Sequence, residues 1–182
     1  FHRRGRFRLS KFRIRRYDST TLFLERKLKI SGQVAKRRTL ITPEEFNRLA
    51  KPAAGWAGGW FLQKAGARGL RPVCQVDYFR TARVLLTPTG PIRVTLDEGM
   101  RAIPVNDMRF HDASHGKLLT DRVILELKYR RDLPVLFREL VAHFGINPVP
   151  SSKYRSAVQT LGLVPTATPA TAKRTPPATA PM

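Results

Sequence analysis

The fold is decided by the stretch Leu22-Phe23-Leu24-Glu25-Arg26-Lys27-Leu28-Lys29-Ile30-Ser31, in which apolar and charged side chains alternate. In an extended chain, successive side chains point to opposite faces. The leucines and Ile30 therefore share one face, whereas Glu25, Lys27 and Lys29 share the other. Such alternation predicts a half-buried β-strand with one apolar face and one basic face.

Five more segments have strand patterns in which Lys or Arg recurs at alternate positions. They are Phe7–Tyr17, Val34–Leu40, Pro72–Arg83, Pro91–Asp97 and Arg122–Arg130. The turn signal Pro88-Thr89-Gly90 predicts that the third and fourth of these segments form a hairpin.

Helical signals follow each half of this pattern. Thr42-Pro43-Glu44-Glu45 predicts the start of a short helix that ends near Ala50, because the threonine and the second glutamate form a capping box around a proline in the first turn. Two further helices are expected, one after Pro134 and one over about Ser152–Leu161. The glycine-rich segment Lys51–Arg71 is expected to be an irregular connection, interrupted by a short helix, between two strand-rich halves.

The composition requires an anionic partner. The chain has 182 residues, 34 Lys plus Arg against 13 Asp plus Glu, and a formal net charge of +21. Hydrophobic residues make up 42% of the chain, which is enough for a folded core. Nucleic acid, an anionic membrane surface or a small polyanion would each complement this charge, and composition alone does not choose among them.

The cysteine count and the distribution of apolar residues indicate the compartment of the protein. Cys74 is the only cysteine, so no disulfide can form within the chain, and a reducing, cytoplasmic setting is expected. No stretch is apolar enough to predict a membrane span.

Residues 1–163 are expected to form one domain, and residues 164–182, rich in Pro, Thr and Ala, a disordered tail. The strand pattern that begins close to Phe1 indicates a fragment whose natural start lies upstream.

The recurrence of the basic face carries more information than any one strand, because a single charged face is usually just solvated. If the strands closed into a barrel, one face of each would point to a common axis. Glu25 and Glu126 are among the few acids on those faces. So many cations could not share a dry interior, but a wet tunnel that holds a polyanion would accommodate them. The cations on these faces are Lys11, Arg13, Arg15, Lys27, Lys29, Lys36, Arg80, Arg93 and Lys128.

An ordered set of short motifs resembles the VTC domain family of polyphosphate polymerases. The motifs are Arg13-Ile14-Arg15-Arg16-Tyr17, Leu22-Phe23-Leu24-Glu25-Arg26-Lys27, Val34-Ala35-Lys36-Arg37-Arg38, Tyr78-Phe79-Arg80, Ile92-Arg93-Val94-Thr95-Leu96-Asp97, Ile124-Leu125-Glu126-Leu127-Lys128-Tyr129 and Ser152-Lys153-Tyr154. The resemblance covers about residues 6 to 162. It implies an α+β fold, an antiparallel β-barrel or triphosphate tunnel with flanking helices, similar to the CYTH and RNA triphosphatase tunnel enzymes. The first strand of that barrel would precede Phe1, so the tunnel domain is expected to lack it.

The resemblance also implies roles for individual residues. The phosphate ligands would be Arg13, Arg15, Lys27, Lys36, Arg80, Arg93, Lys128 and Lys153. Among them, Arg80, Arg93 and Lys153 would be the catalytic cations. Glu126 would hold a divalent metal, Mn²⁺ or Mg²⁺.

Each residue has a simpler alternative. Glu126 would otherwise be an ion-pair partner of Lys128 or Arg93, and Asp97 is expected to orient a neighbouring arginine. Lys29, Arg37 and Arg38 are interpreted as solvated. The histidines His2, His111, His115 and His143 lack metal-ligand spacing.

The implied activity is transfer of the ATP γ-phosphate to a growing polyphosphate chain. ATP and polyphosphate or triphosphate would be the partners, no nucleic acid is expected, and a membrane-bound partner is left open. Three alternatives stay open: hydrolysis of triphosphate or nucleoside triphosphate by the same fold, polyphosphate binding without turnover, and nucleic-acid binding. Against the last, the sequence has no RNP, KH, zinc-finger or basic-zipper pattern. A P-loop motif is also absent.

Overall fold

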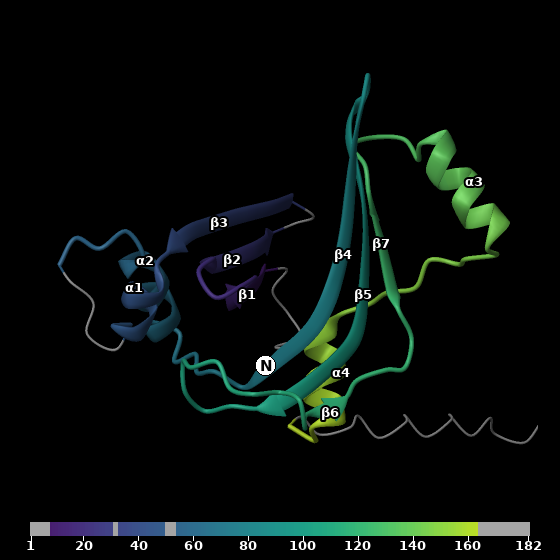
Figure 1. Cartoon of the computed structure of the whole chain (residues 1–182). Coiled ribbons are helices and arrows are strands. Elements are labelled where there is room, and N and C mark those ends of the chain that lie inside the picture. The colour runs from purple at the N-terminus through teal and green to yellow at the C-terminus, as the bar shows by residue number, and fades with distance from the viewer. Residues whose placement is uncertain (1–7, 31–32, 50–53, 164–182) are drawn as a thin grey trace, which may run out of the picture. The chain divides into compact units, whose positions relative to one another are not determined.

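The computed structural model describes residues 8–30, 33–49 and 54–163. The chain divides into two compact units, Phe1–Pro72 and Val73–Met182, and each has its own antiparallel sheet (Figure 1). The boundary falls directly after the glycine-rich connection, as the sequence predicts. The expected disordered tail, residues 164–182, lies outside the described residues.

The first unit is a three-stranded meander with two short helices beside it (Figure 1). Its strands are β1 (Arg8–Arg16), β2 (Leu22–Ile30) and β3 (Gln33–Ile41), in that order across the sheet. The helices are α1 (Pro43–Asn47) and α2 (Gly59–Gly66). These are the predicted elements, with boundaries that differ by one to three residues.

The apolar face of this sheet packs against α2. Leu22 and Leu24 are buried, and the ring of Phe12 meets that of Phe61 edge to face at 5.5 Å. The indole Nε1 of Trp60 donates a hydrogen bond to Thr39 Oγ1 at 2.8 Å. Since one face is covered in this way, the alternation of the strands leaves the opposite face to the charged side chains.

Helix α1 begins with the predicted capping box. The backbone N–H of Glu45 donates to Thr42 Oγ1 at 3.2 Å, and the Glu45 carboxylate accepts from the backbone N–H of Thr42 at 2.8 Å. Both contacts satisfy donors that the first helical turn leaves unpaired.

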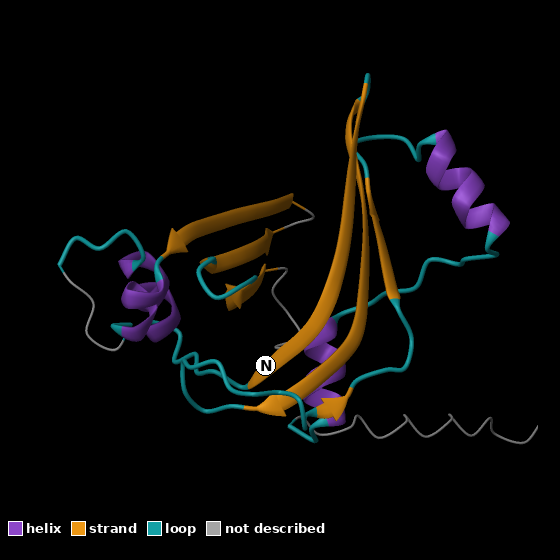
Figure 2. Cartoon of the chain, in the orientation of Figure 1, coloured by secondary structure: helices purple, strands orange, loops and turns teal. Residues whose placement is uncertain are grey.

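The second unit is built on a long curved hairpin, as Figure 2 shows. Its strands β4 (Cys74–Thr87) and β5 (Gly90–Pro104) extend several residues beyond the predicted limits. The short strands β6 (Lys117–Leu118) and β7 (Ile124–Lys128) both pair with β5. Gly90 turns the hairpin with φ of +112°, a conformation that favours glycine.

Two helices complete the second unit. α3 (Val135–His143) and α4 (Lys153–Thr160) lie where the sequence predicts helices. α4 packs on β4 and β5 (Figure 1). Its Ala157 and Val158 are buried.

The observed fold confirms the α+β class, with antiparallel sheets and four helices in the described parts of the chain. Closure of the strands into a barrel stays a prediction. Among the described residues, no helix combines the length and the apolar character that a membrane span needs.

Candidate functional site

The first basic surface is the open face of β1, β2 and β3. The strand register places Lys11 opposite Lys27, and Lys27 opposite Lys36, so three lysines stand side by side across the sheet. All three side chains are exposed. We call this set the lysine rung. Directly opposed side chains have Cβ atoms about 5 Å apart, and like charges at that spacing are destabilising. A bound anion would relieve that repulsion.

Next to the lysine rung, on the same face, Glu25 forms contacts with three arginines. Its carboxylate accepts a hydrogen bond from Arg13 Nε, lies 3.2 Å from Arg38 Nε and lies 3.9 Å from Arg15 Nε. One negative charge therefore faces three guanidinium groups, and this cluster of four side chains keeps a net positive charge. The predicted ligands Arg13, Arg15, Lys27 and Lys36 all belong to this face.

Two neighbouring arginines separate onto opposite faces. Arg38, interpreted from the sequence as solvated, is half exposed but is ion-paired with Glu25 and lies 3.3 Å from the centroid of the Phe23 ring. Arg37 points to the other face and stacks over Trp60 at 4.4 Å. Arg38 therefore joins the basic surface, and Arg37 belongs to the packing of α2.

The second basic surface is one face of β4, β5 and β7. The register aligns Arg80 with Asp97, and Arg93 with Lys128. Between these two levels, Thr95 lies opposite Glu126 and also opposite Ala82. The predicted site residues of this half, Arg80, Arg93, Glu126 and Lys128, thus share one face. Lys153 joins them from the first residue of α4.

Asp97 is the centre of this second surface. Its side chain is fully buried, and it accepts hydrogen bonds from Arg80 Nε at 2.5 Å and Arg80 Nη2 at 2.7 Å. Lys153 Nζ lies 2.6 Å from Asp97 Oδ2, the oxygen that also accepts from Arg80 Nη2. Arg80 and Lys153 both lie 5.2 Å from the centroid of the Tyr78 ring. Asp97 therefore orients an arginine, as the sequence predicts, and also a lysine that the sequence did not connect to it.

The ionisation of this cluster follows from its contacts. Burial acts to raise the pKa of Asp97, but the hydrogen bonds from Arg80 and Lys153 outweigh it, so the pKa lies below its ordinary value. The hydrogen bond to Asp97 likewise raises the pKa of Arg80. At neutral pH Asp97 is therefore a carboxylate and Arg80 a cation.

Glu126 lies at the edge of the cluster. Its Oε1 is 3.0 Å from Lys128 Nζ, and both side chains are nearly half exposed. Burial acts to raise the pKa of Glu126, but Lys128, Arg80 and Lys153 lower it overall, so the group is an anion at neutral pH. The ion pair with Lys128 is the simpler alternative considered for this residue, and it is present in the structure.

The donor set limits how a metal could bind here. No group of three or more His, Cys, Asp or Glu side chains with the geometry of a metal site occurs in the described ranges. Both oxygens of Asp97 already contact Arg80 or Lys153, so among the described residues of this surface Glu126 is the carboxylate left for a metal. Magnesium commonly binds through one or two carboxylates plus substrate phosphates. Glu126 fits that kind of site, with phosphate oxygens as the remaining ligands.

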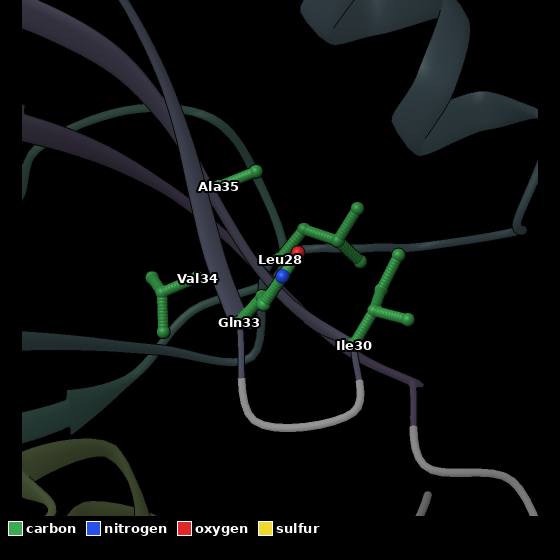
Figure 3. Close-up of a pocket in the computed structure, with 5 residues that line it drawn as sticks. All are labelled: Leu28, Ile30, Gln33, Val34 and Ala35. Carbon is green, nitrogen blue, oxygen red and sulfur yellow. The ribbon is translucent and has the colours of Figure 1, made fainter.

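An apolar pocket lies elsewhere on the first unit. It is lined by Leu28, Ile30, Gln33, Val34 and Ala35 at the end of the β2–β3 hairpin (Figure 3). Among the described residues, its lining includes no charged side chain. We therefore place the candidate site on the two basic surfaces and not in this pocket.

A comparison with models of protein families shows which family the chain is related to. The family model for the VTC domain matches residues 2–162, which include both sheets and α4. The chain belongs to the VTC domain family. Searches of curated proteins and of solved structures found no match for this VTC domain. Family membership links it to polyphosphate.

Three contributions to the surfaces of this VTC domain were missed at the sequence level. Glu25 was noted as an acid but not as the partner of three arginines, and Tyr78 was not connected to Lys153. Thr95 was not singled out at all. Its position between Arg93 and Asp97 in the alternating stretch was the available signal, since residues two apart share a face.

Proposed function

We propose that this VTC domain is a polyphosphate polymerase-like phosphotransferase, which moves the γ-phosphate of ATP to a growing polyphosphate chain. The observation that supports the proposal is that Arg80, Arg93, Lys128 and Lys153 lie on one face, with Arg80 and Lys153 held by the buried Asp97. The proposal includes the basic tunnel of an antiparallel barrel that the family resemblance implies.

Phosphoryl transfer matches these side chains. The reaction needs alignment of the acceptor and neutralisation of charge on the transferred group, and little covalent chemistry from the protein. Arg80 and Arg93 offer planar guanidinium groups that bind phosphate oxygens in pairs, and Lys153 offers a point charge. In this proposal Arg80, Arg93 and Lys153 contact the reacting phosphates. Arg13, Arg15, Lys27, Lys36 and Lys128 bind other phosphates of the substrates.

A divalent metal completes the proposed site. Glu126 would hold Mn²⁺ or Mg²⁺, which when bound supplies further neutralisation of the phosphate charge. Lys128, now paired with Glu126 at 3.0 Å, would release the carboxylate and bind phosphate instead. This exchange leaves no charge without a partner.

The test compares Glu126→Gln with Arg93→Ala and with the control Glu98→Gln, an exposed acid of the same strand as Arg93 on the opposite face. With ATP and Mn²⁺, the wild-type chain is expected to form long-chain polyphosphate. Glu126→Gln should lose metal-dependent turnover, by about a hundredfold or more if one charge contact in the transition state is lost, and should still bind tripolyphosphate. Arg93→Ala should weaken binding itself, and Glu98→Gln should behave as wild type.

Other products would change the proposal. Release of phosphate or pyrophosphate without chain growth would make the domain a hydrolase. Tight binding of tripolyphosphate with no ATP consumption would make it a polyphosphate-binding module. If Glu126→Gln keeps wild-type turnover at limiting Mn²⁺, Glu126 is an ion-pair residue and holds no metal.

A further inference from the structure

Thr95 occupies the middle of the second basic surface. Its side chain is 1% exposed. It lies at one level with Ala82 and Glu126, between the level of Asp97 and the level of Arg93. Within the described part of the chain, two buried side-chain polar atoms have no hydrogen-bond partner, and they are Thr95 Oγ1 and Arg93 Nε.

The closeness in sequence of these two unpaired atoms, Thr95 Oγ1 and Arg93 Nε, indicates a missing hydrogen-bond partner. Buried polar groups in folded proteins are nearly always hydrogen-bonded, because leaving one unpaired costs free energy. Here two unpaired groups lie two residues apart on one strand and on one face. Arg93 Nε–H can only donate, whereas a threonine hydroxyl can donate or accept. An acceptor placed between them would satisfy both.

The spacing of the surrounding cations identifies that acceptor. Arg80 and Lys153 gather at Asp97, and Arg93 lies opposite Lys128 four residues further along the strand. Four residues of strand span about 13 Å. A linear polyanion that contacts both pairs of cations must pass over the level of Thr95 between them.

We propose that Thr95 is a further ligand-binding residue, whose hydroxyl and the Nε–H of Arg93 donate hydrogen bonds to phosphate oxygens of the bound chain. This inference rests on the proposed function, since it places polyphosphate on this face. Glu126 lies directly opposite Thr95, and its side chain is nearly half exposed, so it can move aside to admit the ligand.

Thr95→Val separates this role from a structural one. Valine keeps the shape of threonine and removes the hydroxyl. Since the hydroxyl has no partner in the ligand-free protein, its removal costs no hydrogen bond there and should leave the thermal midpoint unchanged or raise it. In the bound state the variant loses a hydrogen bond to a charged group, which corresponds to about a tenfold or greater loss of affinity.

The experiment is isothermal titration of the full chain with inorganic tripolyphosphate, without divalent metal, together with thermal unfolding. Thr95→Val should bind about tenfold or more weakly, with an undiminished midpoint. Thr95→Ser, which keeps a hydroxyl, should recover most of the lost affinity. The control is Thr81→Val, an exposed threonine on the opposite face of β4.

Two results would overturn the inference while the proposed function stands. One is wild-type affinity in Thr95→Val, and the other is a lowered thermal midpoint, which would show that the hydroxyl makes a structural hydrogen bond. If the wild-type chain does not bind tripolyphosphate, the proposed function fails and the inference fails with it.

Discussion

Asp97 shows how one buried carboxylate can prepare two cations for a ligand. It fixes Arg80 through two hydrogen bonds and Lys153 through an ion pair, while those two side chains stay about one fifth exposed. Each cation thus keeps its position without the full loss of side-chain freedom that binding would otherwise impose. Asp97 is a positioning residue in this arrangement, since Arg80 and Lys153 occupy both of its oxygens and its negative charge would repel phosphate.

Asp97→Asn tests this interpretation. The change leaves Arg80 and Lys153 close together without a countercharge, so we expect a loss of about 3 kcal/mol in the free energy of unfolding at neutral pH. Urea unfolding measures the loss, with Asp121→Asn, an exposed acid, as the control. The variant should also bind tripolyphosphate less tightly. An unfolding free energy equal to that of the control would contradict a stabilising role.

The loss of stability caused by Asp97→Asn should depend on pH. The folded-state pKa of Asp97 is lowered, so the carboxylate stabilises the fold at pH values above its unfolded pKa of about 3.9. That contribution disappears as the pH falls through the lower, folded-state pKa. The difference in stability between wild type and Asp97→Asn should therefore be largest at neutral pH and shrink below about pH 4.

At the scale of elements, α4 matters because it carries Lys153 to the sheet. The helix begins at Lys153 directly after its cap, Ser152, whose hydroxyl accepts from the N–H of Arg155. A cation at a helix N-terminus is unfavourable beside the helix dipole. The ion pair with Asp97 and the buried Ala157 offset this cost.

Ala157→Leu should disturb the site without touching it. The side chain of Ala157 is fully buried, so a larger residue would push α4 away from β4 and β5 at a cost of about 1–3 kcal/mol. Lys153 would move away from Asp97, and affinity for tripolyphosphate should fall. Titration and thermal unfolding measure both effects, with Gln159→Leu on the exposed side of α4 as the control. Unchanged affinity in a destabilised Ala157→Leu would show that α4 does not position a ligand residue.

The elements themselves were largely predictable from sequence. Alternation located β2, and the capping box located the start of α1, because both signals are local. The two-residue strand β6 escaped prediction, since it has no period of its own and exists through pairing with β5. The length of the β4–β5 hairpin likewise depends on cross-strand partners and not on local pattern.

The candidate site was predictable in its faces but not in its contacts. The alternation of side chains along each strand correctly predicted that Arg80, Arg93 and Lys128 share one face of the sheet. It could not reveal that Lys153 would meet Asp97, because these residues are far apart in sequence and come from a helix and a strand. Nor could it reveal the burial of Thr95, which depends on the side chains around it in the folded sheet.

At the scale of the whole molecule, a net charge of +21 makes every anion a competitor. We expect the affinity for tripolyphosphate to fall as salt is added, because several phosphate charges pair with Lys and Arg. We also expect tripolyphosphate to displace duplex DNA at equal phosphate concentration, since the cations lie in rows across two sheet faces. A fluorescence competition assay measures both. Displacement of tripolyphosphate by DNA would favour a nucleic-acid partner instead.

The lysine rung gives this charge a thermodynamic consequence. Lys11, Lys27 and Lys36 repel one another across three neighbouring strands, so in solution they must attract a local atmosphere of small anions. When one polyanion replaces that atmosphere, many small ions regain their translational freedom, as happens when proteins displace the counterions of nucleic acids. Binding at this face is thus an exchange of many mobile ions for one large one, driven in part by the entropy of the ions that leave.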